Sequence, residues 1–160
     1  MDYTLIYGYD RPKEVEELFT EYTNMLVRLD PLFQESLDEQ NYSEEMEHLE
    51  DKYGLPDGRL YLLMDREKAA ASVALHKIDE QTCELKRLYV KPEYRRQGIA
   101  EMLLDRLISE ARETGYSYMV LDTMPALKEA IRLYEKKGFY RIEKYNNNPF
   151  EKMLFYRKDL

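Results

Sequence analysis

A short basic turn between a strand-like run and a helix-like run holds the residue types with the clearest chemistry. Residues 85–90 are apolar and β-branched enough to predict a strand, which Pro92 ends. From Gly98 onward, apolar residues recur at helical spacing. The first turn of a helix offers unpaired N–H groups and the positive end of the helix dipole, and Gly98, without a Cβ, lets an anion approach the backbone. The stretch therefore predicts an anion-binding site.

The distribution of charge is compatible with this site. The 160-residue chain has a formal net charge of −8, yet residues 86–96 hold five basic side chains and a single acidic one. The phosphates of a small cofactor would need such a local reversal of charge. Taken alone, this pattern is more typical of a solvated basic loop after a strand.

The order of residues in this turn resembles the acyl-CoA-binding signature of the GNAT acetyltransferase superfamily. Arg95-x-x-Gly98-x-Ala100 follows a strand ending Leu-x-Val-x-Pro, and the superfamily pattern is Gln/Arg-x-x-Gly-x-Gly/Ala. A second segment, residues 130–139, resembles the superfamily's later helix and following strand. The resemblance implies an N-acetyltransferase that transfers the acetyl group of acetyl-CoA to a primary amine by direct attack in a ternary complex. The alternative is an acyl-CoA-binding sensor or interaction module with little turnover.

The rest of the chain predicts the elements that would position this turn. Strands are expected at 3–9, 60–64, 70–78, 83–90, 118–122, 140–144 and 152–156, and helices at 12–29, within 32–52, and over 98–115 and 125–138. Ser43 is expected as an N-cap and Gly54 as a helix stop. The order β-α-α-β-β-β-α-β-α-β-β is that of the GNAT fold. We expect one α+β domain over residues 1–160, with a mixed central sheet and helices on both faces.

The resemblance also implies which residues hold the cofactor. Pantetheine would lie between the strands at 83–90 and 118–122 and pair with the backbone of Leu88, Tyr89 and Val90, whose last N–H would polarise the thioester carbonyl. The pyrophosphate would rest on the backbone of the turn, with Arg95 as a charged arm; the remaining turn residues are Arg96, Gln97, Gly98, Ile99 and Ala100. The family often has Asn at the position of Leu127, so that contact is lost or supplied elsewhere.

Tyr134 is the predicted general acid. It matches the family's acid tyrosine by the spacing Ala130-x-x-Leu133-Tyr134. A phenol with a pKa near 10 stays protonated at neutral pH and can protonate a leaving thiolate. The alternative is a packed core tyrosine whose hydroxyl has found a partner.

Glu84 is the predicted general base. Strand alternation would place it on the face of Leu88 and Val90, near the cofactor. A structural ion pair with a neighbouring Lys or Arg is the alternative. Asp122 and His76 are weaker candidates for the same role. Cys83 has no obvious His partner and is not expected as a nucleophile.

The acceptor is a small-molecule or peptide amine that the sequence does not identify. The loop 145–149 carries three Asn, and we expect Tyr145 and Asn148 to contact the acceptor; an ordinary hairpin loop is the alternative. The acidic residues between 35 and 51 form either a solvated face or a field that attracts a cationic amine.

Composition argues against several other classes of protein. The acidic balance disfavours nucleic-acid binding, and mean hydropathy of −0.70 disfavours a membrane protein. The single Cys and the lack of a secretory signal favour the cytoplasm. His48 and His76 lie far apart without a Cys pair, so no metal site is expected. A homodimer is compatible with the fold, but no sequence feature indicates one.

Overall fold

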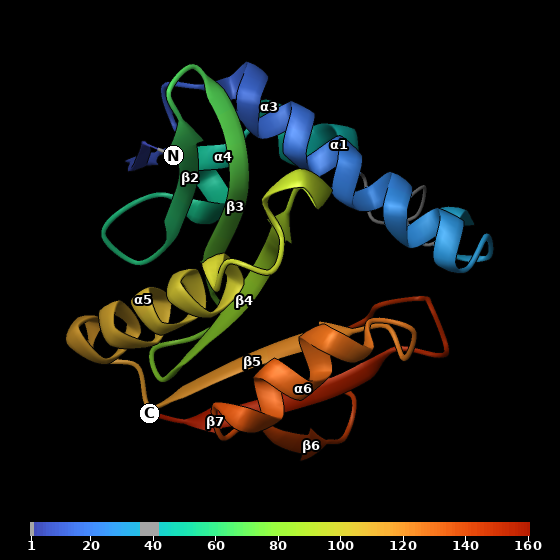
Figure 1. Ribbon diagram of the computed structural model, residues 1–160. Coiled ribbons are helices and arrows are strands. Elements are labelled where there is room, and N and C mark those ends of the chain that lie inside the picture. Colours follow the sequence, from blue (N-terminus) through green and yellow to red (C-terminus); the bar gives the residue numbers. More distant parts are fainter. Residues whose placement is uncertain (1, 36–41) are drawn as a thin grey trace.

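The computed structural model describes residues 2–35 and 42–160, and within them the chain forms a seven-stranded sheet with helices on both faces (Figure 1). In spatial order the strands are β1 (Tyr3–Tyr7), β2 (Arg59–Asp65), β3 (Lys68–Lys77), β4 (Thr82–Val90), β5 (Tyr118–Thr123), β7 (Leu154–Asp159) and β6 (Tyr140–Ile142). Neighbouring strands are antiparallel except β4 and β5, which are parallel. The expected mixed sheet is confirmed.

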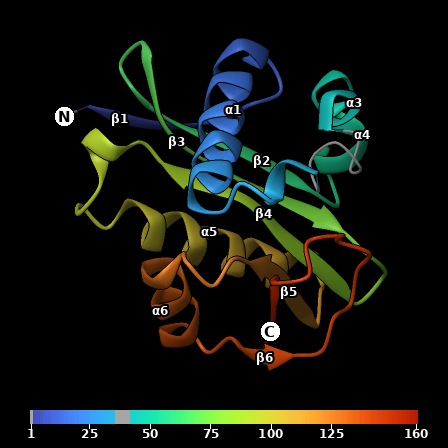
Figure 2. The same cartoon turned by 90° about the vertical axis from the view of Figure 1, so that its right-hand side faces the viewer.

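The helices divide between the two faces of the sheet. They are α1 (Pro12–Leu29), α3 (Tyr42–Glu47), α4 (Leu49–Tyr53), α5 (Ile99–Thr114) and α6 (Lys128–Lys136). Figure 2 shows α1, α3 and α4 above the sheet and α5 and α6 below it. Apolar side chains recur along α1 at three- and four-residue intervals, so one face of this helix is buried. One core cluster lies beneath α1 and α4, and another packs α5 and α6 on the opposite face.

Four helix ends that Pro or Gly marks agree with the sequence predictions. Pro12 begins α1, and Gly98 and Gly115 bracket α5 with φ of +76° and +106°. Gly54 follows the last residue of α4, as expected. No helix among the described residues is long and apolar enough to cross a membrane.

Three element boundaries were predicted wrongly. Ser43 lies inside α3 rather than capping it, because the helix begins one residue earlier; part of the predicted helical stretch, residues 36–41, lies outside the described residues. Pro125 belongs to a turn, closed by the Leu127 N–H donating to the Met124 carbonyl at 3.0 Å, and α6 begins only after it. The strands of the last hairpin also differ from the prediction: β6 ends at residue 142 rather than 144, and β7 covers residues 154–159 rather than 152–156.

Strand β4 contains a β-bulge that changes which of its side chains share a face of the sheet. Its register with β3 shifts opposite residues 72–74, so one extra residue of β4 is accommodated there, and Arg87 takes φ of +58°. The regular alternation of side chains between the two faces of the sheet is therefore interrupted at Arg87.

The bulge corrects one prediction about Glu84. Before the bulge, Leu85 packs in the core beneath α5, so Glu84 points to the opposite face of the sheet. After it, Leu88 and Val90 pack on the α5 side and Tyr89 packs beneath α1. The prediction that Glu84 shares a face with Leu88 and Val90 is therefore wrong.

Candidate active site

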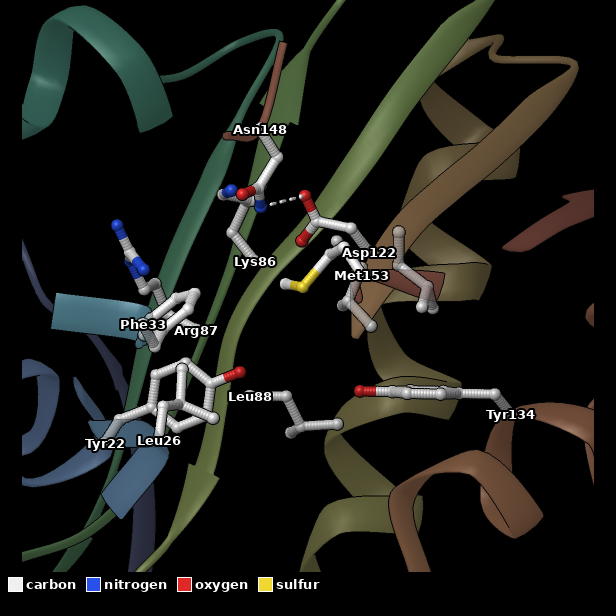
Figure 3. A pocket seen from close by; sticks show the side chains of 12 residues that line it. Tyr22, Leu26, Phe33, Lys86, Arg87, Leu88, Asp122, Tyr134, Asn148 and Met153 are labelled. Atoms are coloured by element: carbon white, nitrogen blue, oxygen red, sulfur yellow. Dashed lines mark hydrogen bonds between the residues drawn. The ribbon is translucent and has the colours of Figure 1, made fainter. Parts of the chain in front are cut away.

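A cavity lies where β4 and β5 separate. The two strands pair only over residues 82–84 and 118–120, and Figure 1 shows them diverging beyond that point. We call the space between them the fork cavity (Figure 3). It is lined by Tyr22, Leu26, Phe33, Leu85, Lys86, Arg87, Leu88, Leu121, Asp122, Tyr134, Asn148 and Met153. The predicted separation of these two strands is confirmed.

The turn before α5 presents backbone N–H groups to solvent. Gly98 is the N-cap, and the first intrahelical bond runs from the Met102 N–H to the Gly98 carbonyl at 3.0 Å. The N–H groups of the first turn, including those of Ile99 and Ala100, therefore lack an intrahelical acceptor, and no described side chain caps them. Arg96 also has a left-handed backbone, with φ of +64°. This curved, exposed backbone suits an anion such as a pyrophosphate.

Arg95 lies against the end of β4 rather than extending from the turn. Its Nε donates to the Val90 carbonyl at 2.9 Å, and its guanidinium lies over the Tyr89 ring at 5.7 Å. The Lys91 N–H donates to the Ala70 carbonyl of β3 at 3.0 Å, so alternation turns the Val90 N–H away from β3 and toward the fork. The Val90 N–H is the backbone donor that this end of the strand offers. A phosphate contact by Arg95 stays a prediction.

Two of the other predicted cofactor residues are held by α1 and β1. The Tyr89 hydroxyl donates to Glu21 at 3.3 Å, so this side chain lies on the α1 face and only its backbone remains for a cofactor. The Gln97 side chain accepts a hydrogen bond from the Tyr3 hydroxyl at 2.7 Å. Leu88 lines the fork cavity directly.

Tyr134 places a hydroxyl inside the fork cavity. Its side chain is 7% exposed, and Figure 3 shows the hydroxyl pointing across the cavity toward Leu88. No described residue forms a hydrogen bond with this hydroxyl. Burial raises the pKa of Tyr134 well above its ordinary value, with smaller contributions from Tyr22 and Asp122. The phenol is therefore protonated and can act as an acid but not as a base at neutral pH.

Glu84 lies at the base of the fork and is enclosed. It is buried and accepts a hydrogen bond from the Tyr145 hydroxyl. Burial and the neighbouring Glu84 raise the pKa of Tyr145 far above its ordinary value, so Tyr145 holds its proton. Glu84 forms no ion pair with a described residue, unlike the alternative considered above, and it does not line the cavity.

Asp122 projects from β5 into the fork cavity. Its Oδ2 accepts hydrogen bonds from the side-chain amides of Asn146 at 2.8 Å and Asn148 at 3.2 Å. The loop between β6 and β7 thus contacts both carboxylates of the fork, through Tyr145 and through these amides. Asn148 lines the cavity as the sequence suggested, and Tyr145 does not.

Three residues weighed for chemistry lie away from the cavity. The Nδ1 of His76 lies 3.2 Å from the Lys52 carbonyl, and burial lowers its pKa. Burial raises the pKa of Cys83 to about 12, so its thiol stays protonated. Leu127, in the place of the family's Asn, packs in a small core cluster. No group of metal-ligating side chains occurs among the described residues.

The sequence analysis did not assign the charged and aromatic residues that α1 and β4 contribute to the cavity. Tyr22 was read only as part of the apolar stripe of α1, and burial raises its pKa to about 12. Arg87 is held by Glu45 of α3 at 2.6 Å. Lys86 was counted among the basic residues of the turn, yet it faces the fork cavity. Contacts between such distant segments leave no local pattern in the sequence.

Known proteins share this sequence pattern and fold. The acetyltransferase (GNAT) family pattern matches residues 25–139. An uncharacterized N-acetyltransferase of Schizosaccharomyces pombe is 37% identical over 76% of this chain and 76% of its own. The crystal structure of an acetyltransferase from Streptococcus agalactiae has a TM-score of 0.82 at 24% identity, covering 99% of this chain and 98% of its own.

One solved relative contains the cofactor. A GNAT family acetyltransferase from Elizabethkingia anophelis with acetyl-CoA bound has a TM-score of 0.56 at 27% identity, over 71% of this chain and 82% of its own. The matched family region contains the turn before α5, the separation of β4 and β5, and Tyr134. On these grounds the chain belongs to the GNAT family and is an acetyl-CoA-dependent acetyltransferase.

Proposed function

We propose that the chain transfers the acetyl group of acetyl-CoA to a primary amine by direct attack in a ternary complex. The amine nitrogen bonds to the thioester carbon, the carbon–sulfur bond breaks, and the thiolate leaves as CoA. The amine gives up a proton and the thiolate gains one. No acyl-enzyme is needed, and the one described thiol, that of Cys83, is buried.

The observation that carries this proposal is the Tyr134 hydroxyl inside the fork cavity, which has no hydrogen-bond partner among residues 2–35 and 42–160. It points toward Leu88 (Figure 3), and Val90 lies two residues further along the same strand with its N–H turned toward the fork. A thioester beside Leu88 would have the Val90 N–H as the donor for its carbonyl and the Tyr134 hydroxyl as the proton donor for its sulfur.

Glu84 is proposed as the group that receives the amine proton. Neither Glu84 nor Tyr145 lines the fork cavity, so the proton would pass from the amine to a water molecule and then through the Tyr145 hydroxyl, which already donates to Glu84. In one transfer Tyr145 would take a proton on its oxygen while releasing its own to the carboxylate. Its phenolate would never accumulate, which agrees with its raised pKa.

Two measurements test the proposed function in sequence. Thermal unfolding with and without acetyl-CoA tests the cofactor, because a ligand that binds only the folded state raises its stability. Release of free thiol is then followed with a panel of amines that includes amino acids, polyamines and peptides. A thermal shift followed by thiol release with one class of amine is expected. A thermal shift without release from any amine would favour the binding-module alternative.

A further inference from the structure

Two side chains of opposite charge in the fork cavity lack an ion-pair partner among the described residues. These are Lys86 on β4 and Asp122 on β5, and neither lies within 4.0 Å of an opposite charge there. The cavity's third charged residue differs, because Arg87 is paired with Glu45 at 2.6 Å. The cavity therefore presents one cation and one anion that no described residue neutralises.

Asp122 is arranged to receive a cation. Both of its hydrogen-bond donors are neutral amides, of Asn146 and Asn148, and both bind Oδ2. The amides orient the carboxylate without cancelling its charge, and Oδ1 has no donor among the described residues. Figure 3 shows this carboxylate directed into the cavity. An ammonium group is the natural partner of such an oxygen.

Lys86 indicates what the acceptor must carry besides an ammonium group. It lines the same cavity, so a bound molecule that offered only a positive charge would meet a like charge there, which disfavours binding. A neutral amine would leave Lys86 without a partner. A carboxylate on the acceptor would form an ion pair with Lys86. The neighbouring cavity wall is apolar, formed by Leu26, Phe33 and Met153, and accommodates a carbon skeleton between the two charges.

We propose that the acceptor is an amino-acid-like molecule, a primary amine that also carries a carboxylate. Its ammonium group binds Asp122 before losing a proton, and its carboxylate binds Lys86. The inference rests on the proposed function and narrows it to one substrate class. The exposed acidic residues elsewhere on the chain have no part in it.

Matched substrates test the proposal first. For leucine, methionine, phenylalanine and lysine, thiol release is measured with the amino acid, its carboxamide and the amine left by decarboxylation. We expect kcat/KM to be at least tenfold higher for the amino acid than for either counterpart in one or more of these sets. Equal or faster reaction of the decarboxylated amines overturns the proposal. Turnover of polyamines or peptides alone would also overturn it, yet leave the proposed function standing; no turnover of any amine would remove both.

A charge variant separates recognition by Lys86 from general effects. Lys86→Met should lower kcat/KM for the best amino acid at least tenfold while leaving the rate with its decarboxylated amine within threefold. Lys68→Met is the matched control, since Lys68 is exposed at the first position of β3; it removes the same charge away from the cavity and should change neither rate. Equal losses with both substrates in Lys86→Met, at unchanged melting temperature, would assign Lys86 a structural role and overturn the proposal.

Discussion

The two ends of the active site are assembled in opposite ways. The turn predicted to bind an anion, which we call the anion-binding turn, consists of consecutive residues, 95–100, and offers mainly backbone N–H groups. The fork cavity uses side chains from α1, β4, β5, α6 and the loop before β7. A backbone site in one turn needs only its own conformation and tolerates different neighbours. A side-chain site spread over the chain can change its specificity when any one contributor changes.

The partners of the basic residues also indicate that the turn relies on its backbone. The five basic residues between 86 and 96 reverse the local charge, which could serve the phosphates of a cofactor or belong to a solvated loop. In the structure Lys91 pairs with Glu17 of α1 at 2.7 Å and Arg87 pairs with Glu45, while Arg95 donates to Val90. Only part of this positive charge is left for a ligand. We therefore expect the backbone and the helix dipole to contribute more to the predicted anion binding than the side chains do.

The largest effect is expected on acetyl-CoA affinity, from Gly98→Glu in the anion-binding turn. A carboxylate there would face the pyrophosphate, and such like-charge contact costs roughly 4 kcal/mol, about a 1000-fold loss of affinity. Gly115→Glu is the matched control, since Gly115 also has positive φ and open space around it, at the other end of α5. Titration calorimetry with acetyl-CoA should show lost binding for Gly98→Glu alone. Similar affinity for both variants would remove the phosphate assignment.

The next largest effect is expected from Tyr134→Phe. Losing a general acid typically costs about 100-fold in turnover, whereas acetyl-CoA affinity should stay within about twofold. Steady-state kinetics and calorimetry on the same sample separate the two quantities. Because the pKa of Tyr134 is raised, the wild-type rate should not decline through Tyr134 ionisation up to about pH 10.

Tyr22→Phe is the control for the acid assignment. Its hydroxyl also lines the fork cavity, and Figure 3 shows it on the opposite side from Tyr134. Removing it should leave most of the turnover, because only the hydroxyl beside the thioester sulfur can donate the proton. Equal losses in the two variants would mean that the cavity needs its hydroxyls for packing or polarity, not for proton transfer.

A smaller effect is expected from the pair Glu84→Gln and Tyr145→Phe. If Tyr145 delivers the proton to Glu84, each change should lower kcat about tenfold or more, and the double variant should lose little beyond either single one. Thiol release between pH 6 and 9 measures both. If the variants lower only the melting temperature and not kcat, the pair stabilises the loop before β7 instead of accepting the proton. Asp122 would then be the remaining candidate for the proton acceptor.

Local signals explain which parts of the molecule the sequence could predict. Pro12, Gly98 and Gly115 mark helix ends because each constrains its own backbone, and the strands around them follow from short apolar runs. The sequence does not predict the bulge at Arg87, because a bulge at a residue other than Gly or Pro leaves no local signal. The Arg87 side chain pairs with Glu45 of α3, which is distant in the sequence. The sequence does not predict the hydrogen bonds from Asn146 and Asn148 to Asp122, because these partners lie more than 20 residues apart.

The smallest effect on acetyl transfer is expected from Glu45→Gln. This variant removes the charge that pairs with Arg87 at the β4 bulge and tests how much that pair stabilises the fold. Burial disfavours the Glu45 charge, but Arg87 and Lys52 outweigh it and lower the pKa of Glu45 from 4.5 to about 2. A carboxylate whose pKa is lower when folded contributes stability above its unfolded pKa and loses it as pH falls. That shift corresponds to about 3 kcal/mol at neutral pH, and the contribution should disappear between about pH 5 and 2.

Urea unfolding of Glu45→Gln and wild type at several pH values measures this difference. The gap in unfolding free energy should be largest near pH 7 and shrink below pH 5, whereas Glu44→Gln, an exposed neighbour on α3, should show no gap. Acetyl-CoA affinity at pH 7 should be unchanged, because the anion-binding turn depends on its own backbone and not on α3. A matching loss of acetyl-CoA affinity would show that the bulge also sets the position of the turn, and the two ends of the site would then have to be treated as one coupled unit.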